Sequence, residues 1–275
     1  MSDTSAIFEA SQNLPTVSAV VQALIKSFDD PEVDIDSIAK QLIKDQTLSA
    51  RVLRLANTPA YGGSRKIASI GDAVLVLGFN ALRTLVLSCG ITSSIKTPRE
   101  FNIQEFWLQS FKVAATASWL AKVCRKSADI AFTVGLLHNL GDVLIFTAFP
   151  DKGAQLQRMV WAGQSRISSE MQLLGCSYAD VGAELARRWR FPDMMVEAIQ
   201  EQESNPEHAA VPDMALLLQL AKQVVQSIDA GVPPERLVGT LSRVVLDQLH
   251  LNPDILLTRY SEMVEVGRDA ALFAS

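Results

Sequence analysis

The chain has 275 residues, of which 48% are hydrophobic and 20% charged, with a formal net charge of −5. This composition excludes an intrinsically disordered chain, and the acidic balance argues against a general nucleic-acid binder. Three widely spaced cysteines, Cys89, Cys124 and Cys176, have no CxxC spacing, so we expect reduced thiols in a cytoplasmic protein. Residues 46–99 hold seven bases and one acid, which could attract an acidic partner or a phosphate or could simply form a solvated face.

The first half of the chain has the apolar spacing of helices. Residues 1–13 show no apolar run, so no signal peptide is expected and the stretch is assigned to an N-terminal tail. Apolar side chains then recur every three to four positions over residues 35–43, where Asp34 or Asp36 can cap the helix. The same spacing returns over residues 48–57, and turn-forming residues follow it.

A long apolar run follows Ser69 and predicts one helix over residues 70–91. Within it, Val74–Leu77 could also be read as a short buried strand, although the length of the run favours a helix. The run is the best candidate for a membrane span, but Asn80 and Arg83 interrupt it, and charge is costly in lipid. A buried helix is therefore expected, and no membrane partner.

The second half continues the helical pattern after a break at residues 93–99. The expected helices cover residues 106–122, 128–146, 153–163, 168–174, 180–190, 193–203, 214–228, 234–248 and 253–272. Almost no segment alternates with the period of a strand. The fold class predicted from these patterns is all-α, with roughly a dozen helices.

One polar pair interrupts the most apolar of these helices, at His138 and Asn139 within the stretch from Gly135 to Asp142. Burying such a pair is costly unless both side chains find hydrogen-bond partners. A single histidine on an apolar helix is more often a satisfied core residue than a ligand. Asp142, one turn further on, could supply its partner.

The stretch Gly-Leu-Leu-His-Asn-Leu-Gly at residues 135–141 resembles the Leu-Leu-His-Asp-Ile-Gly core of HD-superfamily metal phosphohydrolases. Further segments resemble the HDOD family, which consists of regulatory modules in bacterial signalling. In chain order these segments are Leu14–Val17, Asp45–Asn57, Tyr61–Gly62, Ser69–Ile70, Ala73–Val74, Leu77–Gly78, Leu82–Arg83, Phe106–Trp107 and Val181–Leu185, followed by Trp189 and Pro192. The resemblance implies an N-terminal helical bundle, residues 14–98, packed on an HD-like helical half with C-terminal helices, residues 99–275.

The resemblance also implies which positions would hold a metal, and this chain departs from the family pattern at most of them. His138 is kept, while the neutral amide of Asn139 stands in place of an aspartate. The remaining positions align with Gln109, Tyr178 and Lys222. Because a divalent metal needs several anionic or imidazole ligands, we expect no metal, no cofactor and no catalytic residue.

A second candidate site lies in the basic segment. Arg51, Arg54 and Asn57 fall close to one helix face, next to Tyr61. Together they could grip an anion or a partner carboxylate. Alternatively, the arginines tie the N-terminal bundle to the acidic C-terminal half.

These observations favour a non-catalytic signal-transduction module that binds a partner protein or a small ligand. The alternative is a residual metal-dependent phosphohydrolase acting on a nucleotide or a cyclic dinucleotide. A nucleic-acid-linked regulator using residues 46–99 is a third possibility, which the acidic pI of about 5.3 opposes.

Overall fold

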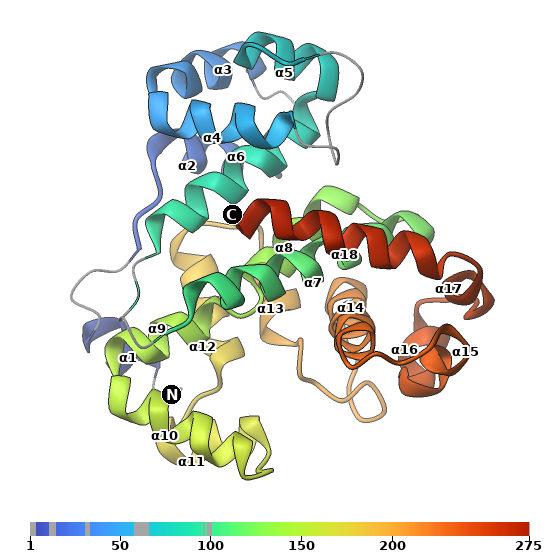
Figure 1. Ribbon diagram of the computed structural model, residues 1–275. Helices are drawn as coiled ribbons and strands as arrows, with labels where there is room; N and C mark the ends of the chain where they lie inside the picture. The colour runs from blue at the N-terminus through green and yellow to red at the C-terminus, as the bar shows by residue number, and fades with distance from the viewer. Residues whose placement is uncertain are drawn as a thin grey trace.

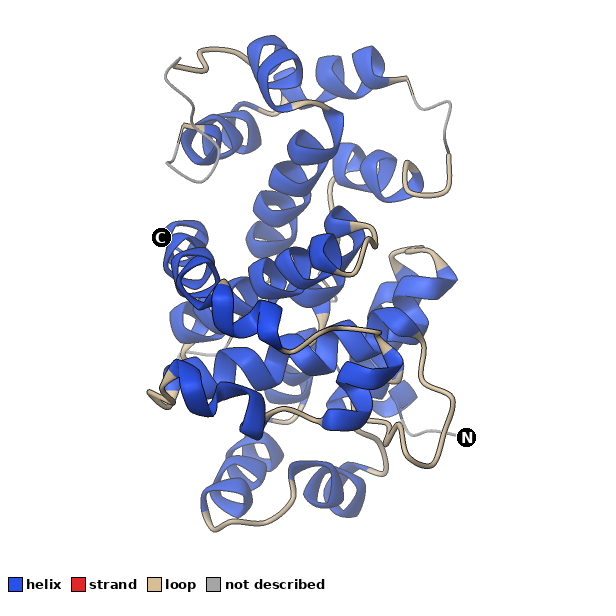
Figure 2. Ribbon diagram, turned by 90° about the vertical axis from the view of Figure 1, so that its right-hand side faces the viewer, coloured by secondary structure: helices blue, strands red, loops and turns tan. Residues whose placement is uncertain are grey.

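The computed structural model describes residues 4–10, 15–30, 34–57, 66–95, 97 and 101–274. Within these ranges the secondary structure is helical and contains no strand, as Figure 2 shows. The predicted all-α class is confirmed.

The N-terminal lobe is a bundle of short helices (Figure 1). They are α2 (Ala19–Lys26), α3 (Ile35–Lys44), α4 (Gln46–Ala56), α5 (Ile70–Leu77) and the longer α6 (Phe79–Ser94). The side chain of Asp34 caps α3 by accepting a hydrogen bond from the Ser37 amide at 3.0 Å. Asp45 caps α4 in the same way, through the Leu48 amide. Of these two consecutive capped helices, α4 packs on α6, whereas α3 packs on α2, α4 and α5.

Gly78 divides the run that predicted a single helix over residues 70–91, so that prediction is wrong. Its φ is 80°, in the left-handed region that favours glycine, and α5 ends before it while α6 begins after it. Val74–Leu77 lie in α5, which excludes the alternative of a buried strand.

The N-terminal tail assigned to residues 1–13 contains a helix, α1 (Thr4–Ala10), that packs on the larger lobe. Ile7 and Phe8 are buried, and the Arg188 guanidinium lies 4.1 Å from the centre of the Phe8 ring. Residues 4–10 therefore belong to the folded core rather than to a solvated tail.

The larger lobe is built around α7 (Ile103–Val123), which packs on α8, α14 and α18 (Figure 1). Its other helices are α8 (Ala128–Leu137), α9 (Leu140–Ala148), α10 (Pro150–Trp161), α11 (Arg166–Leu174), α12 (Tyr178–Arg188), α13 (Asp193–Gln200), α14 (Asp213–Asp229), α15 (Pro234–Leu237), the 3-10 helix η1 (Val238–Thr240), α16 (Arg243–Gln248), α17 (Asp254–Thr258) and α18 (Tyr260–Ala274). The helices predicted over residues 128–146, 234–248 and 253–272 are each interrupted. In the second of these, Leu241 is extended and the Ser242 side chain caps a new helix.

Residues Ala128–Ala148 are long and apolar enough to cross a membrane by length and composition alone. However, 72% of the most apolar part is buried inside the protein, as expected for the core helices α8 and α9. Residues 73–91, the best candidate for a membrane span in the sequence analysis, do not meet this criterion of length and composition.

A partly buried ion pair connects the two lobes. Arg83 on α6 pairs with Asp129 on α8, donates a hydrogen bond of 3.0 Å to the Ser27 carbonyl, and lies 3.9 Å from the Phe28 ring centre. Burial acts to raise the pKa of Asp129, but the hydrogen bond from Ser127 and the charge of Arg83 outweigh it, and the net shift is downward. Arg83, which interrupts the apolar run in the sequence, thus forms a contact between the two lobes.

Candidate functional site

The polar pair noted in the sequence lies at a break between two helices. His138 follows α8, and Asn139 occupies the N-cap position of α9. His138 is 6% exposed, and its Nδ1 lies 2.6 Å from the Gly135 carbonyl oxygen, so this nitrogen carries the proton. Burial, together with the nearby Lys222 charge, lowers the pKa of His138 to about 3. The imidazole is therefore neutral at physiological pH.

Neighbouring helices meet the pair at very short range. A Cβ atom added to Gly141 would lie 1.9 Å from the Tyr178 carbonyl oxygen, so only glycine lets α9 approach α12 this closely. On the other side, the Ser110 hydroxyl on α7 donates a hydrogen bond of 3.0 Å to the Asn139 side-chain oxygen. The pair is therefore fixed by backbone packing as well as by hydrogen bonds.

A cluster of polar side chains surrounds His138; we call it the His138 cluster, and it comprises His138, Tyr178, Gln202, Glu203 and Lys222. The Gln202 amide donates 2.7 Å to the His138 carbonyl, which the helix break leaves free. The Lys222 ammonium lies 2.9 Å from the Tyr178 hydroxyl and 3.2 Å from the Gln202 side-chain oxygen, and it pairs with Glu203. Burial lowers the pKa of Lys222 and raises that of Tyr178.

A second cation borders this cluster. The Arg166 guanidinium stacks 3.8 Å from the centre of the Tyr178 ring and forms ion pairs with Asp142 and Glu170. Glu170 is buried and also accepts a hydrogen bond of 2.9 Å from the Tyr178 amide. Asp142 therefore pairs with Arg166, and the expectation that it would be the partner of His138 is wrong.

The structure brings together most of the positions aligned with metal ligands. His138, Tyr178 and Lys222 belong to one cluster, and Asn139 adjoins it. Gln109 does not join it, because its amide donates hydrogen bonds of 3.0 Å to Glu105 and to Asp229.

Sequence reasoning missed four residues of this region, Arg166, Glu170, Gln202 and Glu203. Arg166 and Glu170 are spaced at i, i+4, a pattern that predicts an ion pair and was available in the sequence. Gln202 lies on a turn far along the chain, and no local pattern marks it.

The donor set of this region does not suit a divalent metal. No group of three or more His, Cys, Asp or Glu side chains converges within the described ranges. The neutral amide of Asn139 binds cations weakly. The two charged side chains that lower the pKa of His138, Lys222 and Arg166, are both cationic. The side chains of this region instead form hydrogen bonds and ion pairs with one another.

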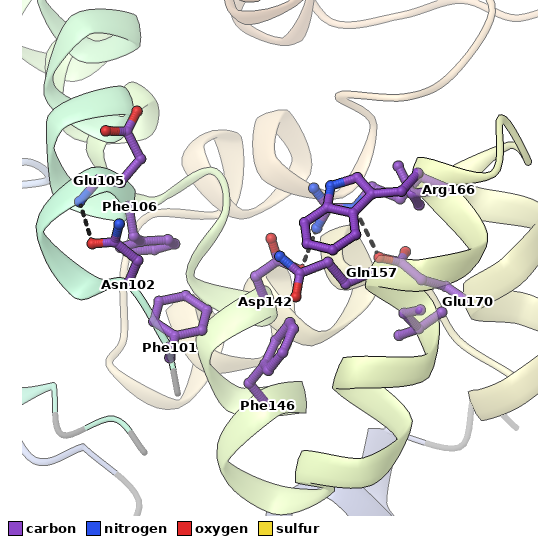
Figure 3. Close-up of a pocket in the computed structure, with 12 residues that line it drawn as sticks. Phe101, Asn102, Glu105, Phe106, Asp142, Phe146, Gln157, Arg166 and Glu170 are labelled. Atoms are coloured by element: carbon purple, nitrogen blue, oxygen red, sulfur yellow. Dashed lines mark hydrogen bonds and ion pairs between the residues drawn. The ribbon is translucent and has the colours of Figure 1, made fainter. Parts of the chain in front are cut away.

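A cavity of about 330 Å³ opens beside the His138 cluster, between the start of α7 and helices α9, α10 and α11 (Figure 3). Asp142, Arg166 and Glu170 form part of its wall. Its other lining residues are Phe101, Asn102, Glu105, Phe106, Phe146, Leu156, Gln157, Val160 and Trp161. Its volume lies within the range of small-molecule sites.

The second candidate site is only partly assembled. Arg51 and Arg54, which we call the α4 arginines, are both exposed, and Arg51 donates a hydrogen bond to the Ser93 hydroxyl on α6. Asn57 is already used, because its side chain exchanges hydrogen bonds of 2.8 and 2.9 Å with the backbone of Ile67. Tyr61 lies outside the described residues. The alternative role for these arginines was to tie the two lobes together; in the described part of the chain, Arg83 forms an ion pair that does so.

Comparison with known proteins gives concordant matches. The family model of the HDOD domain matches residues 14–205. An uncharacterized protein of Treponema pallidum is 25% identical over 244 residues, which make up 86% of this chain but only 47% of that protein. The chain thus spans about half the length of this curated relative.

Solved structures resemble the whole chain. A protein of Shewanella amazonensis SB2B, provisionally described as a phosphohydrolase, is 28% identical, with a TM-score of 0.83 and 98% of each chain covered. An HDOD domain protein of unknown function from Geobacter sulfurreducens is 26% identical, with a TM-score of 0.81 over 98% of this chain and 96% of that one. A provisionally described signal-transduction protein of Marinobacter aquaeolei VT8 shares the fold at 22% identity, with a TM-score of 0.78 over 99% of this chain and 66% of that one.

Proposed function

This chain belongs to the HDOD family, and we propose that it is a non-catalytic signalling module of the cytoplasm that binds a partner protein or a small ligand. The observation that carries the proposal is the Lys222 ammonium, held by Tyr178, Gln202 and Glu203 beside His138. This lysine stands at a position where the family resemblance places a metal ligand. The protein's own cation thus takes the place of an external one.

The physical argument concerns charge and lone pairs. Metal-dependent phosphohydrolysis needs a bound cation to activate water and to offset the charge of the phosphate. A protonated lysine has three donors and no lone pair, so it cannot coordinate a metal and repels one. Arg166 adds a second positive charge, stacked 3.8 Å from the centre of the Tyr178 ring. Both cations are paired with carboxylates, so Asp142, Glu170 and Glu203 are less available to a metal ion.

A residual phosphohydrolase acting on a nucleotide or a cyclic dinucleotide is the second candidate. It is favoured by the likeness to the Shewanella protein that is provisionally described as a phosphohydrolase, and by the histidine kept at position 138. It requires a metal to bind in spite of Lys222. Metal affinity therefore separates the two candidates.

The test is a calorimetric titration of the purified protein with Mn²⁺, combined with elemental analysis. We expect no stoichiometric metal in the wild-type chain and no saturable binding. A double variant, Asn139→Asp with Lys222→Asp, restores two carboxylates and should bind Mn²⁺ more tightly than the wild type. One or two tightly bound transition-metal ions per wild-type chain would contradict the proposal.

The α4 arginines are the proposed contact for a partner protein. They are exposed, they lie in the basic part of the chain, and Arg54 has no ion pair among the residues that the structure describes. An acidic surface would suit them. An affinity pull-down from native cells, with mass spectrometry, would identify the partner. Capture of that partner by variants in which the α4 arginines are replaced by glutamate then tests the contact.

A further inference from the structure

One wall of the cavity beside the His138 cluster is an aromatic ring that its neighbours hold in place. The Phe146 ring of α9 lies edge to face with the Phe101 ring, and the two ring centres are 5.2 Å apart. Helix α10 approaches the same ring so closely that a Cβ atom added to Gly153 would lie 2.7 Å from it. At the rim, Val160 and Trp161 of α10 are 39% and 77% exposed. A flat ligand would therefore meet a preorganised aromatic surface and cover apolar side chains that folding leaves in water.

The polar groups of the cavity are satisfied to different degrees. Glu170 uses both carboxylate oxygens, because Oε1 accepts 2.9 Å from Arg166 Nε and Oε2 accepts 2.9 Å from the Tyr178 amide. Asp142 pairs with Arg166 through Oδ1, and the described part of the chain offers no donor to its Oδ2. The side-chain amide of Gln157, which also lines the cavity, has no hydrogen bond within the described ranges. The cavity thus keeps one carboxylate oxygen and one amide for a ligand.

The available oxygen and the aromatic ring belong to the same face of one helix. Asp142 and Phe146 are four residues apart on α9, a spacing that places their side chains side by side. Figure 3 shows both side chains directed toward the space that Gln157 enters from α10. A planar molecule lying against the Phe146 ring can therefore direct a donor in its own plane toward Asp142.

We propose that this cavity binds an uncharged, planar aromatic heterocycle, with the ring against Phe146 and a ring N–H donated to Asp142. A carboxylate only accepts hydrogen bonds, so the ligand must supply the donor. An anion would be repelled by Asp142 and Glu170, and a cation at Asp142 would meet the Arg166 guanidinium, so neither charge is favoured. The volume of about 330 Å³ accommodates a two-ring molecule.

Such a ligand would act on the His138 cluster through Asp142. This carboxylate pairs with Arg166, which stacks 3.8 Å from the centre of the Tyr178 ring, and the Tyr178 hydroxyl lies 2.9 Å from the Lys222 ammonium. A hydrogen bond to Asp142 therefore changes an ion pair that borders the cluster. A role for this binding as an input signal rests on the proposed signalling function, whereas the binding itself does not.

The experiment is a calorimetric titration of the full chain with indole and with benzofuran, which has the same shape but carries an oxygen in place of the N–H. We expect indole to bind about tenfold more tightly. Asp142→Ala should weaken indole binding about tenfold and leave benzofuran unchanged, so that the preference disappears. Phe146→Leu should weaken both ligands about fivefold and keep the preference, because it removes only the aromatic face. Asp151→Ala, an exposed control on α10 outside the cavity wall, should change neither affinity.

The proposal is overturned if indole does not bind, if it binds no more tightly than benzofuran, or if its preference survives in a folded Asp142→Ala variant. Melting curves establish that each variant is folded. Should Asp142→Ala fail to fold, Asp142→Asn keeps a neutral acceptor and should reduce the preference to about threefold, and an undiminished preference would contradict the site. The metal titration is independent. A chain that binds Mn²⁺ tightly and prefers indole contradicts only the proposed function, and a chain that binds neither contradicts only this site.

Discussion

The His138 cluster and the α4 arginines are two polar regions that the sequence marks as candidates, and the structure treats them in opposite ways. In the cluster, Lys222 is paired with Glu203 and the neutral imidazole of His138 is hydrogen-bonded to a backbone carbonyl. On α4, both guanidiniums reach solvent, and Arg51 has one hydrogen bond to a serine. Charges that are neutralised internally maintain a fold, whereas exposed charges remain available to a partner. The comparison therefore predicts that the first region controls stability and the second controls binding.

The largest effect on stability should come from Gly141→Ala, next to the cluster. The new methyl group would overlap the Tyr178 carbonyl oxygen, an atom of the backbone that cannot rotate away. We expect a loss of about 3 kcal/mol or more in the free energy of unfolding. The control is Gly239→Ala, where an added Cβ meets nothing within 4 Å. Similar melting temperatures for the two variants would contradict the close approach of α9 to α12.

His138→Ala should have the next largest effect, about 1–3 kcal/mol, because it removes a buried hydrogen bond and leaves space behind. The pKa of His138 is about 3 in the folded chain, against about 6.5 in the unfolded one. Unfolding therefore takes up a proton between these values, so this part of the stability falls as the pH drops from about 6.5 to about 3.

Denaturant unfolding at several pH values tests this, with the exposed His208→Ala as the control. Below pH 6.5, the free energy of unfolding should fall less steeply with decreasing pH in the His138→Ala variant than in the wild type. The His208→Ala variant should keep the wild-type dependence. If the His138→Ala variant keeps the full wild-type dependence of the unfolding free energy on pH, His138 is not the buried neutral group described above.

The sequence alone predicts the fold class and several of the helices, but not where some of the buried helices end. Helical periodicity was sufficient for the fold class and for α3 and α4, because these two helices have one apolar face. It failed at Gly78 and at His138–Asn139, where the apolar run continues although the backbone turns. When two successive helices are both buried on all sides, the hydrophobic pattern continues across the turn between them. The pattern therefore does not indicate where the first helix ends.

The site shows the same limit. The family resemblance indicated His138, Tyr178 and Lys222, which the fold brings together, but also Gln109, which bonds elsewhere. Gln202 and Arg166 approach the cluster only through tertiary packing, so no local spacing could identify their role. Asn57 looked like part of an anion site, yet the backbone of Ile67 uses both ends of its amide.

Lys222→Met should have a smaller effect, about 1 kcal/mol, because the lysine side chain is 25% exposed and methionine retains most of its packing. Its hydrogen bonds to Tyr178 and Gln202 are lost, and Glu203 is left near the surface, where water can solvate it. Thermal unfolding measures the change, and the exposed Lys40→Met is the matched control. A lysine that was merely a solvated surface charge would give no difference between the two variants.

Charge reversal of the α4 arginines should have the smallest effect on stability. We expect Arg51→Glu and Arg54→Glu to change the free energy of unfolding by no more than about 0.5 kcal/mol. Capture of the partner in a pull-down should nevertheless fall, while Arg236→Glu, an exposed control on α15, should leave it unchanged. Equal capture by all three variants would move the contact surface away from α4.

Hydrolysis tests the central claim most directly. The wild-type chain and His138→Ala are each incubated with a chromogenic nitrophenyl phosphodiester, with Mn²⁺ and then with Mg²⁺, and the release of nitrophenol is followed. The account predicts no rate above the protein-free blank for either protein, because Lys222 and Arg166 oppose the metal that the reaction needs. Metal-dependent turnover in the wild type, abolished in a His138→Ala variant that is still folded at the assay temperature, would contradict it.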